Sequence, residues 1–92
     1  MHSIIPGDEK GRCYICSRRL PTETHHMLHG CRRAMADKYG LTVNLCRECH
    51  RTLHDKGTYD RDLEEIAQET FEERYSAALW FEVFGKNYRR SE

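Results

Sequence analysis

The sequence predicts a small α+β fold, in which a finger of two short strands and a helix precedes a helical tail. Three observations predict it. A β-rich segment with alternating apolar residues, 41–45, runs into a segment where two histidines stand four residues apart. Apolar and aromatic residues recur at helical spacing in the last third of the chain. Two Cys-x-x-Cys pairs frame the finger, at Cys13/Cys16 and Cys46/Cys49.

The length of 92 residues indicates one small domain, 1–92, whose modest core usually needs a staple such as a bound metal. We expect a loose lead-in over 1–11, the finger over 12–56 and a helical tail over 57–92 that packs on the finger. No run of about 18 or more apolar residues is present, which excludes a membrane-spanning helix. The first residues lack the pattern of a secretory signal, so we expect a cytoplasmic protein with reduced cysteines.

Charge divides the chain into two unlike parts. Residues 1–56 carry ten Lys/Arg and six Asp/Glu, a net charge of +4, whereas residues 57–92 carry five Lys/Arg and nine Asp/Glu, a net charge of −4. Because Lys and Arg displace counterions from phosphates, a basic part that also carries the cysteine and histidine motifs fits a polyanionic partner. A mixed, solvated surface is the alternative interpretation.

The elements of the finger follow from local patterns. Cys-x-x-Cys is typical of a zinc knuckle, a tight turn that offers two sulfurs to one ion. Gly40 stands where the end of a helix favours a left-handed residue. The expected elements are a knuckle at 13–16, an extended segment at 20–28, a short helix at 31–39, a strand at 41–45 and a helix from 47 to about 55.

The tail is expected to be helical in two pieces. The segment 57–60 breaks the chain, and Asp60 is predicted to be the N-cap of the first piece. Ser76 is predicted to cap a second piece over 77–84. Trp80, the single tryptophan, belongs to an aromatic stripe that we expect to form core against the finger.

The paired cysteines can present four thiolates tetrahedrally to one structural zinc ion, whose binding free energy then also stabilises the fold. We expect Cys46 at the end of the second strand and Cys49 in the first turn of the next helix. Two disulfides or unpaired buried thiols are the alternatives. The fifth cysteine, Cys31, is expected to be a small buried residue or a free thiol.

Four histidines predict a second, open metal site. His50 and His54 lie one helical turn apart and can give two imidazoles to one metal, and the strand with the doublet can give a third. Adjacent side chains of a strand point to opposite faces, so only one of His25 and His26 can face the metal. The other is free to take a proton from water, a role that suits histidine near neutral pH. Histidines of the surface or core, without a metal, are the alternative.

With these motifs the chain resembles the HNH endonucleases (His-metal finger, or ββα-metal, nucleases), and in particular short HNH proteins of phages and prophages. The resemblance covers about residues 13–88. It implies a zinc-stabilised ββα-metal finger of treble-clef-like shape. The motifs that carry the resemblance are Cys13-x-x-Cys16, His25-His26, Gly30-Cys31-Arg32-Arg33, the segment from Lys38 to Val43, Asn44-Leu45-Cys46-x-x-Cys49-His50-x-x-x-His54, and Phe84-Gly85-Lys86-Asn87-Tyr88.

Carried over by position, the resemblance assigns a role to each motif. His26 matches the general base, and the four paired cysteines match the structural zinc knuckle of many members. Asn44 matches the asparagine that braces the loop holding the base, but it stands only two residues before Cys46, closer than usual. Arg32 or Arg33 is the alternative occupant of that loop position. The ligands of the catalytic divalent ion are His25, His50 and His54.

The implied function is an endonuclease that hydrolyses phosphodiester bonds in DNA, nicking or cutting with weak sequence preference, through one divalent ion and a histidine base. The ion could be Mg²⁺, Mn²⁺, Ni²⁺ or Zn²⁺, because imidazoles suit zinc and nickel whereas hydrolysis in cells often uses magnesium. RNA is an alternative substrate. Arginines that could brace the phosphate are Arg32, Arg33, Arg47 and Arg51.

A binding module is the alternative function. It would be a catalytically silent zinc-finger adaptor of phage origin that binds nucleic acid, or binds a protein through the helical tail near Trp80. The displaced Asn44 and the acidic tail favour this alternative. If the protein is phage-encoded, it would act in the cytoplasm of a bacterial host, whether as an endonuclease or as an adaptor.

Overall fold

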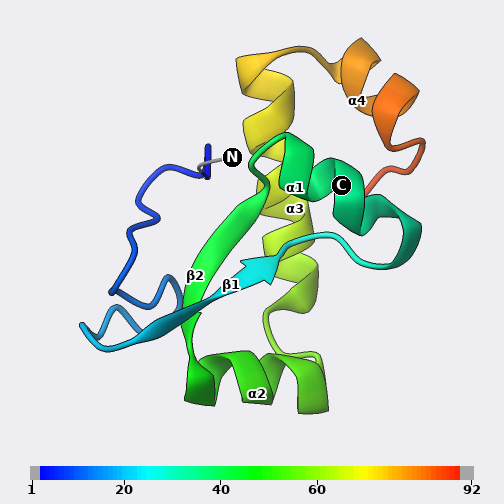
Figure 1. The fold of residues 1–92 in the computed structure, drawn as a ribbon. Coiled ribbons are helices and arrows are strands. Elements are labelled where there is room, and N and C mark those ends of the chain that lie inside the picture. The colour runs from blue at the N-terminus through cyan, green and yellow to red at the C-terminus, as the bar shows by residue number, and fades with distance from the viewer. Residues whose placement is uncertain (1–2, 90–92) are drawn as a thin grey trace.

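The computed structural model describes residues 3–89, and their elements form a small α+β fold with a two-stranded antiparallel sheet and four α-helices (Figure 1). The α+β class predicted from the sequence is therefore confirmed. Within the described residues, no helix is both long and apolar enough to span a membrane. The elements are β1 (Thr22–His26), a 3₁₀ turn (Gly30–Arg32), α1 (Arg33–Lys38), β2 (Thr42–Cys46), α2 (Arg47–Lys56), α3 (Asp60–Arg74) and α4 (Ala77–Val83).

The two strands place the histidine doublet beside α2. β1 pairs with β2 so that His25 lies opposite Val43 and His26 opposite Thr42. Because side chains alternate along a strand, Glu23 and His25 share one face of the sheet and His26 projects from the other. α2 contacts both strands and runs across one end of the sheet (Figure 1). The first strand therefore presents alternate side chains to this helix.

α2 follows β2 without an intervening loop. Cys46 is the last residue of β2 and the N-cap of α2, where its Sγ accepts a hydrogen bond from the backbone N–H of Cys49. The predicted places of these two cysteines, at the strand end and in the first helical turn, are confirmed. Gly57 ends α2 with φ +68°, a left-handed conformation that other residues adopt at a cost.

One of the two helix caps predicted in the tail is wrong. The N-cap of α3 is Tyr59, and Asp60 is the first helical residue. The Asp60 carboxylate instead contacts the imidazole of His29, a residue distant in the sequence, so a tertiary contact replaces the local cap. At α4 the prediction is confirmed, because the Ser76 hydroxyl accepts a hydrogen bond from the backbone N–H of Leu79 at 3.0 Å.

The lead-in segment differs from its prediction, because the described residues 3–11 are anchored rather than loose. The N–H of Ile4 donates to the carbonyl of Gly40 at 2.9 Å, and the Asp8 carboxylate accepts from the backbone N–H of Asn44 at 2.7 Å. The side chain of Ile5 is buried in the core. An apolar pair, Ile4 and Ile5, and one acidic side chain thus fix this segment along β2.

Finger and tail share one hydrophobic core. In Figure 1, α3 runs behind the sheet and α4 folds back at its far end. Phe71 of α3 and Trp80 of α4 are fully buried, as the aromatic pattern predicts. The Trp80 indole N–H donates to the carbonyl of Lys86 at 2.8 Å, which satisfies its buried polar atom. The core residues are Ile5, Cys13, Met27, Leu28, Ala36, Leu41, Val43, Leu45, Cys46, Leu53, Leu63, Ala67, Phe71, Trp80 and Phe84.

Candidate metal centres

Four cysteines gather where β2 runs into α2. One sulfur from each of Cys13, Cys16, Cys46 and Cys49 lies within 4.8 Å of the others. The Sγ atoms of Cys16 and Cys46 are 3.9 Å apart. Zinc–thiolate bonds of about 2.3 Å in a tetrahedron separate neighbouring sulfurs by about 3.8 Å. All five cysteines, including the exposed Cys31, are free thiols, so the four clustered ones can bind a metal such as zinc.

Hydrogen bonds to sulfur support this cluster. Backbone N–H groups of Cys16 and Cys49 donate to the Sγ atoms of Cys13 and Cys46, each at 3.4 Å. The guanidinium of Arg18 donates to Cys16 Sγ, and this hydrogen bond is the main reason that the pKa of Cys16 falls to about 6. Burial raises the pKa of Cys49 instead. A cation bound among the four sulfurs would favour their thiolate form.

Three imidazoles form a second cluster, on the face of β1 that α2 covers. One ring nitrogen from each of His25, His50 and His54 lies within 4.8 Å of the others, and Nε2 of His50 is 3.0 Å from Nε2 of His54. Ligand nitrogens around one ion with bonds of about 2.0–2.1 Å stand about 3–3.5 Å apart. The distance between the His50 and His54 nitrogens lies in this range, and the three residues could hold a metal ion.

His25 is the buried member of this cluster. It is 2% exposed, and its Nε2 is the one buried side-chain nitrogen or oxygen without a hydrogen-bond partner in the described part of the chain. Burial, together with the nearby imidazoles of His50, His29 and His54, lowers the pKa of His25 to about 4. The ring is therefore neutral near neutral pH, which is the form that binds metal. A ligand at Nε2 would satisfy an atom that otherwise costs stability.

A carboxylate holds the neighbouring imidazole in a defined tautomer. The Glu23 carboxylate accepts a hydrogen bond from Nδ1 of His50 at 3.0 Å, and this bond is the main cause of the lowered pKa of Glu23. With its proton on Nδ1, His50 has a free lone pair on Nε2, the nitrogen that faces His54. Carboxylate–histidine pairs of this kind commonly support metal ligands.

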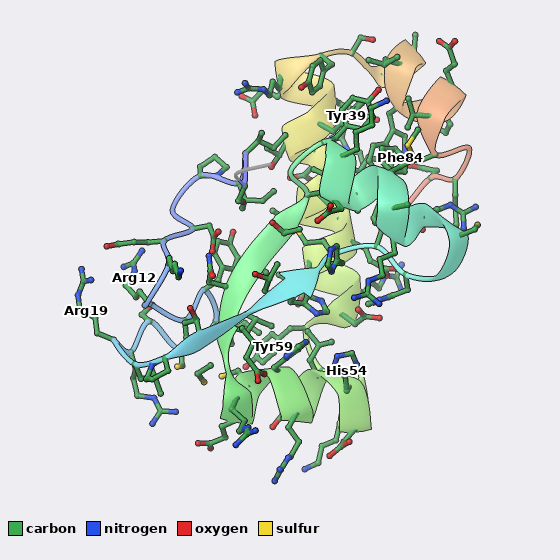
Figure 2. The ribbon with its side chains drawn as sticks, in the orientation of Figure 1. Arg12, Arg19, Tyr39, His54, Tyr59 and Phe84 are labelled. Carbon is green, nitrogen blue, oxygen red and sulfur yellow. The ribbon has the colours of Figure 1, made fainter. Side chains whose placement is uncertain are left out.

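The histidine cluster opens into a cavity of about 150 Å³. Figure 2 shows His54 on the side of α2 that faces β1. The cavity is small and open to solvent, so a phosphate group could reach the imidazoles. Its lining residues are Thr24, His25, His26, His29, Arg33, His50 and His54.

His26 also lines this cavity, although its orienting partner differs from the predicted one. Its Nε2 lies 3.1 Å from Oδ1 of Asp37 on α1. The side-chain amide of Asn44 donates to Asp8 at 3.0 Å, and its Oδ1 accepts from the hydroxyl of Thr22. Asn44, which the resemblance matches to the asparagine that braces the loop of the base, thus has Asp8 of the lead-in segment and Thr22 as its side-chain partners.

The four candidate arginines occupy different environments. Arg33 lines the cavity beside the histidines. Arg32 donates from Nε to the carbonyl of Phe84 at 3.0 Å, so it ties the loop after β1 to the tail. Arg47 and Arg51 are exposed on α2 outside the lining of the cavity. Of the four, Arg33 is therefore best placed to meet a phosphate bound there.

Three carboxylates that contact histidines of the site were not predicted from the sequence as their partners. Glu23 could have been found, because it stands two residues before His25 and so shares its face of the strand. Asp37 and Asp60 meet His26 and His29 only through the folding of α1 and α3, and no local pattern signals these contacts.

The two clusters suit different chemistry. Four cysteine ligands would enclose an ion completely, whereas three imidazoles at an open cavity leave coordination positions for water or substrate. Comparison with protein-family models, curated proteins and solved structures finds no match for this chain. The function is therefore inferred from the geometry of the two clusters and the chemistry of their residues.

Proposed function

We propose that this protein is a metal-dependent endonuclease of the HNH, ββα-metal type that hydrolyses phosphodiester bonds in DNA. The observation that supports it most is the histidine cluster: His25, with its buried and unpartnered Nε2, lies beside His50 and His54 at an open cavity. The same cavity holds a further imidazole, His26, and a guanidinium, Arg33. In this proposal β1, β2 and α2 correspond to the two strands and the helix of a ββα-metal finger, and the 3₁₀ turn and α1 lie between the strands.

His26 is the general base in this proposal. The Asp37 carboxylate can only accept, so Nε2 of His26 carries the proton of their hydrogen bond and Nδ1 is left to take a proton from water. The water then attacks the phosphorus in line with the leaving 3′ oxygen. Asp37 stabilises the imidazolium that results, as carboxylates do in other histidine bases.

His25, His50 and His54 would hold one divalent ion, which when bound supplies Lewis-acid stabilisation of charge on the phosphate and on the leaving oxygen. Mg²⁺, Mn²⁺, Ni²⁺ and Zn²⁺ are the candidates. Arg33 binds a phosphate oxygen from the lining of the cavity. Because these groups contact the DNA backbone and not the bases, weak sequence preference is expected.

Plasmid nicking with each candidate ion tests the proposal. His26→Ala should lower the rate by about 100-fold or more, because a general base contributes that much, while zinc content and circular dichroism stay as in the wild type. Glu73→Ala, an exposed change on α3, is the matched control and should leave cleavage unchanged. Full activity of the His26 variant would remove it from the base role. No cleavage of duplex or single-stranded DNA with any ion would contradict the endonuclease itself.

The alternative function is a zinc-finger adaptor that binds DNA or protein without chemistry. The engagement of Asn44 by Asp8 favours it, since the residue expected to brace the base is occupied elsewhere. A protein partner of the tail would meet Tyr75 and Phe81, which are 43% and 49% exposed, rather than the buried Trp80. DNA binding without cleavage in the nicking assay would identify the adaptor.

A further inference from the structure

A second set of ligand groups adjoins His25. Nε2 of His29, just after β1, lies 2.6 Å from Oδ1 of Asp60, the first residue of α3. One ligand atom from each of His25, His29 and Asp60 lies within 4.8 Å of the others. His25 therefore belongs to two triads, one completed by His50 and His54 and the other by His29 and Asp60.

The second triad has the features of a built site. The ring centroid of His25 is 5.7 Å from that of His29 and 5.9 Å from that of His54, so the two neighbours are equally near. Nε2 of His25 is buried without a partner, which distinguishes this group from an ordinary surface pair of histidine and carboxylate. Asp60 also makes no cap for its own helix, so its carboxylate is committed to His29.

We propose that His25, His29 and Asp60 form a second divalent-cation position next to the imidazole triad, with Nε2 of His25 common to both. One nitrogen lone pair binds one ion, so the two positions are alternatives for a single exchangeable cation. The set of two imidazoles and one carboxylate is harder than three imidazoles and therefore favours Mn²⁺ and Co²⁺ more. The inference concerns metal binding alone and goes beyond the proposed endonuclease activity.

The position would give the tail a part in the metal site. Asp60 begins α3, whereas His25 and His29 belong to the finger. An ion at this position would join the two parts of the chain through a bond at the surface of their shared core. Metal binding would then depend on the placement of α3 as well as on the finger.

Removal of the imidazole triad isolates the second position. In His50→Ala/His54→Ala, prepared with zinc at the cysteines, we expect one Co²⁺ per chain in addition to the zinc, measured by native mass spectrometry and by the visible absorption of Co²⁺. Adding Asp60→Asn should weaken Co²⁺ binding by at least about 10–100-fold, because a loss of that size is typical even for a residue that only orients a ligand. Asp62→Asn, an equal loss of charge in the same turn of α3, is the matched control.

Two outcomes would overturn the proposal. One is a folded double variant, with native near-ultraviolet circular dichroism from Trp80, that takes up no Co²⁺ beyond the zinc. The other is equal Co²⁺ affinity with Asp60→Asn and with Asp62→Asn, which would reduce His29 and Asp60 to a hydrogen-bonded pair. Should the double variant not fold, the single variant His54→Ala replaces it, and the Co²⁺ affinities of Asp60→Asn and Asp62→Asn are compared in that chain, where the imidazole triad still lacks a ligand. These experiments measure metal binding and not DNA cleavage. Failure of this proposal can therefore be distinguished from failure of the proposed endonuclease activity.

Discussion

Three imidazoles that line the cavity have a carboxylate partner: His29 pairs with Asp60, and His50 and His26 with the carboxylates considered next. Glu23 accepts from Nδ1 of His50 at 3.0 Å, and Asp37 lies 3.1 Å from Nε2 of His26. Each carboxylate fixes the ring nitrogen that carries the proton and so fixes the nitrogen that is free to act. The free nitrogen of His50 faces His54, and in the proposed reaction the free nitrogen of His26 takes the proton from water.

Asp37→Asn tests the positioning role of this carboxylate. We expect kcat for DNA cleavage to fall by about 10–100-fold with KM and metal content unchanged. The amide can present its NH₂ group, which cannot accept a hydrogen bond from Nε2 of His26. Asp37→Glu should restore part of kcat, a rescue that a merely structural role would not produce. Unchanged kcat in Asp37→Asn would show that His26 is oriented by another group.

Sequence patterns predict site residues when the signal is local. His50 and His54 stand one helical turn apart, and His25 and His26 alternate in a strand, so both placements follow from the periods of helix and strand. Asp37 and Asp60 reach His26 and His29 only after α1 and α3 have packed, so no period in the sequence reveals them.

At the scale of elements, the cysteine cluster lies where β2 meets α2. Cys46 ends the strand and caps the helix, and Cys49 lies in the first helical turn. Cys13 and Cys16 bring the segment before β1 to the same point. An ion bound there would fix how α2 lies against the sheet, and hence how His50 and His54 approach His25.

Cys46→Ser should therefore abolish the zinc site and the cooperative fold. A structural zinc contributes on the order of 10 kcal/mol in small fingers, comparable with the whole stability of a small domain. Cys31→Ser is the matched control: its thiol is exposed outside the cluster, so the free energy of unfolding should change by less than about 0.5 kcal/mol. Zinc content and near-ultraviolet circular dichroism are the measurements. A cooperatively folded Cys46→Ser without zinc would contradict the structural role of the cluster.

Most helices and strands could be predicted from residue propensity and spacing. The predictions that differ from the structure fail where contacts between distant parts of the chain decide the local structure. The predicted strand at 41–45 corresponds to β2 at Thr42–Cys46, because β-branched and apolar residues alternate there. The lead-in has little periodicity, and its anchoring depends on a partner in β2, Asn44, that only the folded chain supplies. The same holds for Asp60, whose carboxylate contacts His29 instead of capping α3.

For the whole molecule, one aromatic group joins the finger to the tail. The ring of Phe71 on α3 lies 5.2 Å from that of Tyr39, which follows α1, and 5.4 Å from that of Trp80 on α4. Figure 2 shows Tyr39 and Phe84 close together at this end of the molecule. Finger and tail are therefore expected to unfold as a single unit.

Phe71→Ala should destabilise both parts together. Loss of a fully buried phenylalanine typically costs about 3–5 kcal/mol, whereas Phe81→Ala, at a half-exposed position, should cost little. In urea, Trp80 fluorescence reports the tail and the absorption of Co²⁺ substituted at the cysteines reports the finger. The two transitions should coincide and shift equally in Phe71→Ala. Separate midpoints would contradict the shared core.

The central claim is that three imidazoles bind an exchangeable cation apart from the ion at the cysteines. The most direct test is the number of metal ions per chain, counted by native mass spectrometry before and after mild chelation. We expect two ions before and one after in the wild-type chain, and one ion throughout in a variant that lacks the shared ligand, His25→Ala. A single ion in the wild-type chain under saturating metal, or an undiminished second ion in His25→Ala, would contradict the claim.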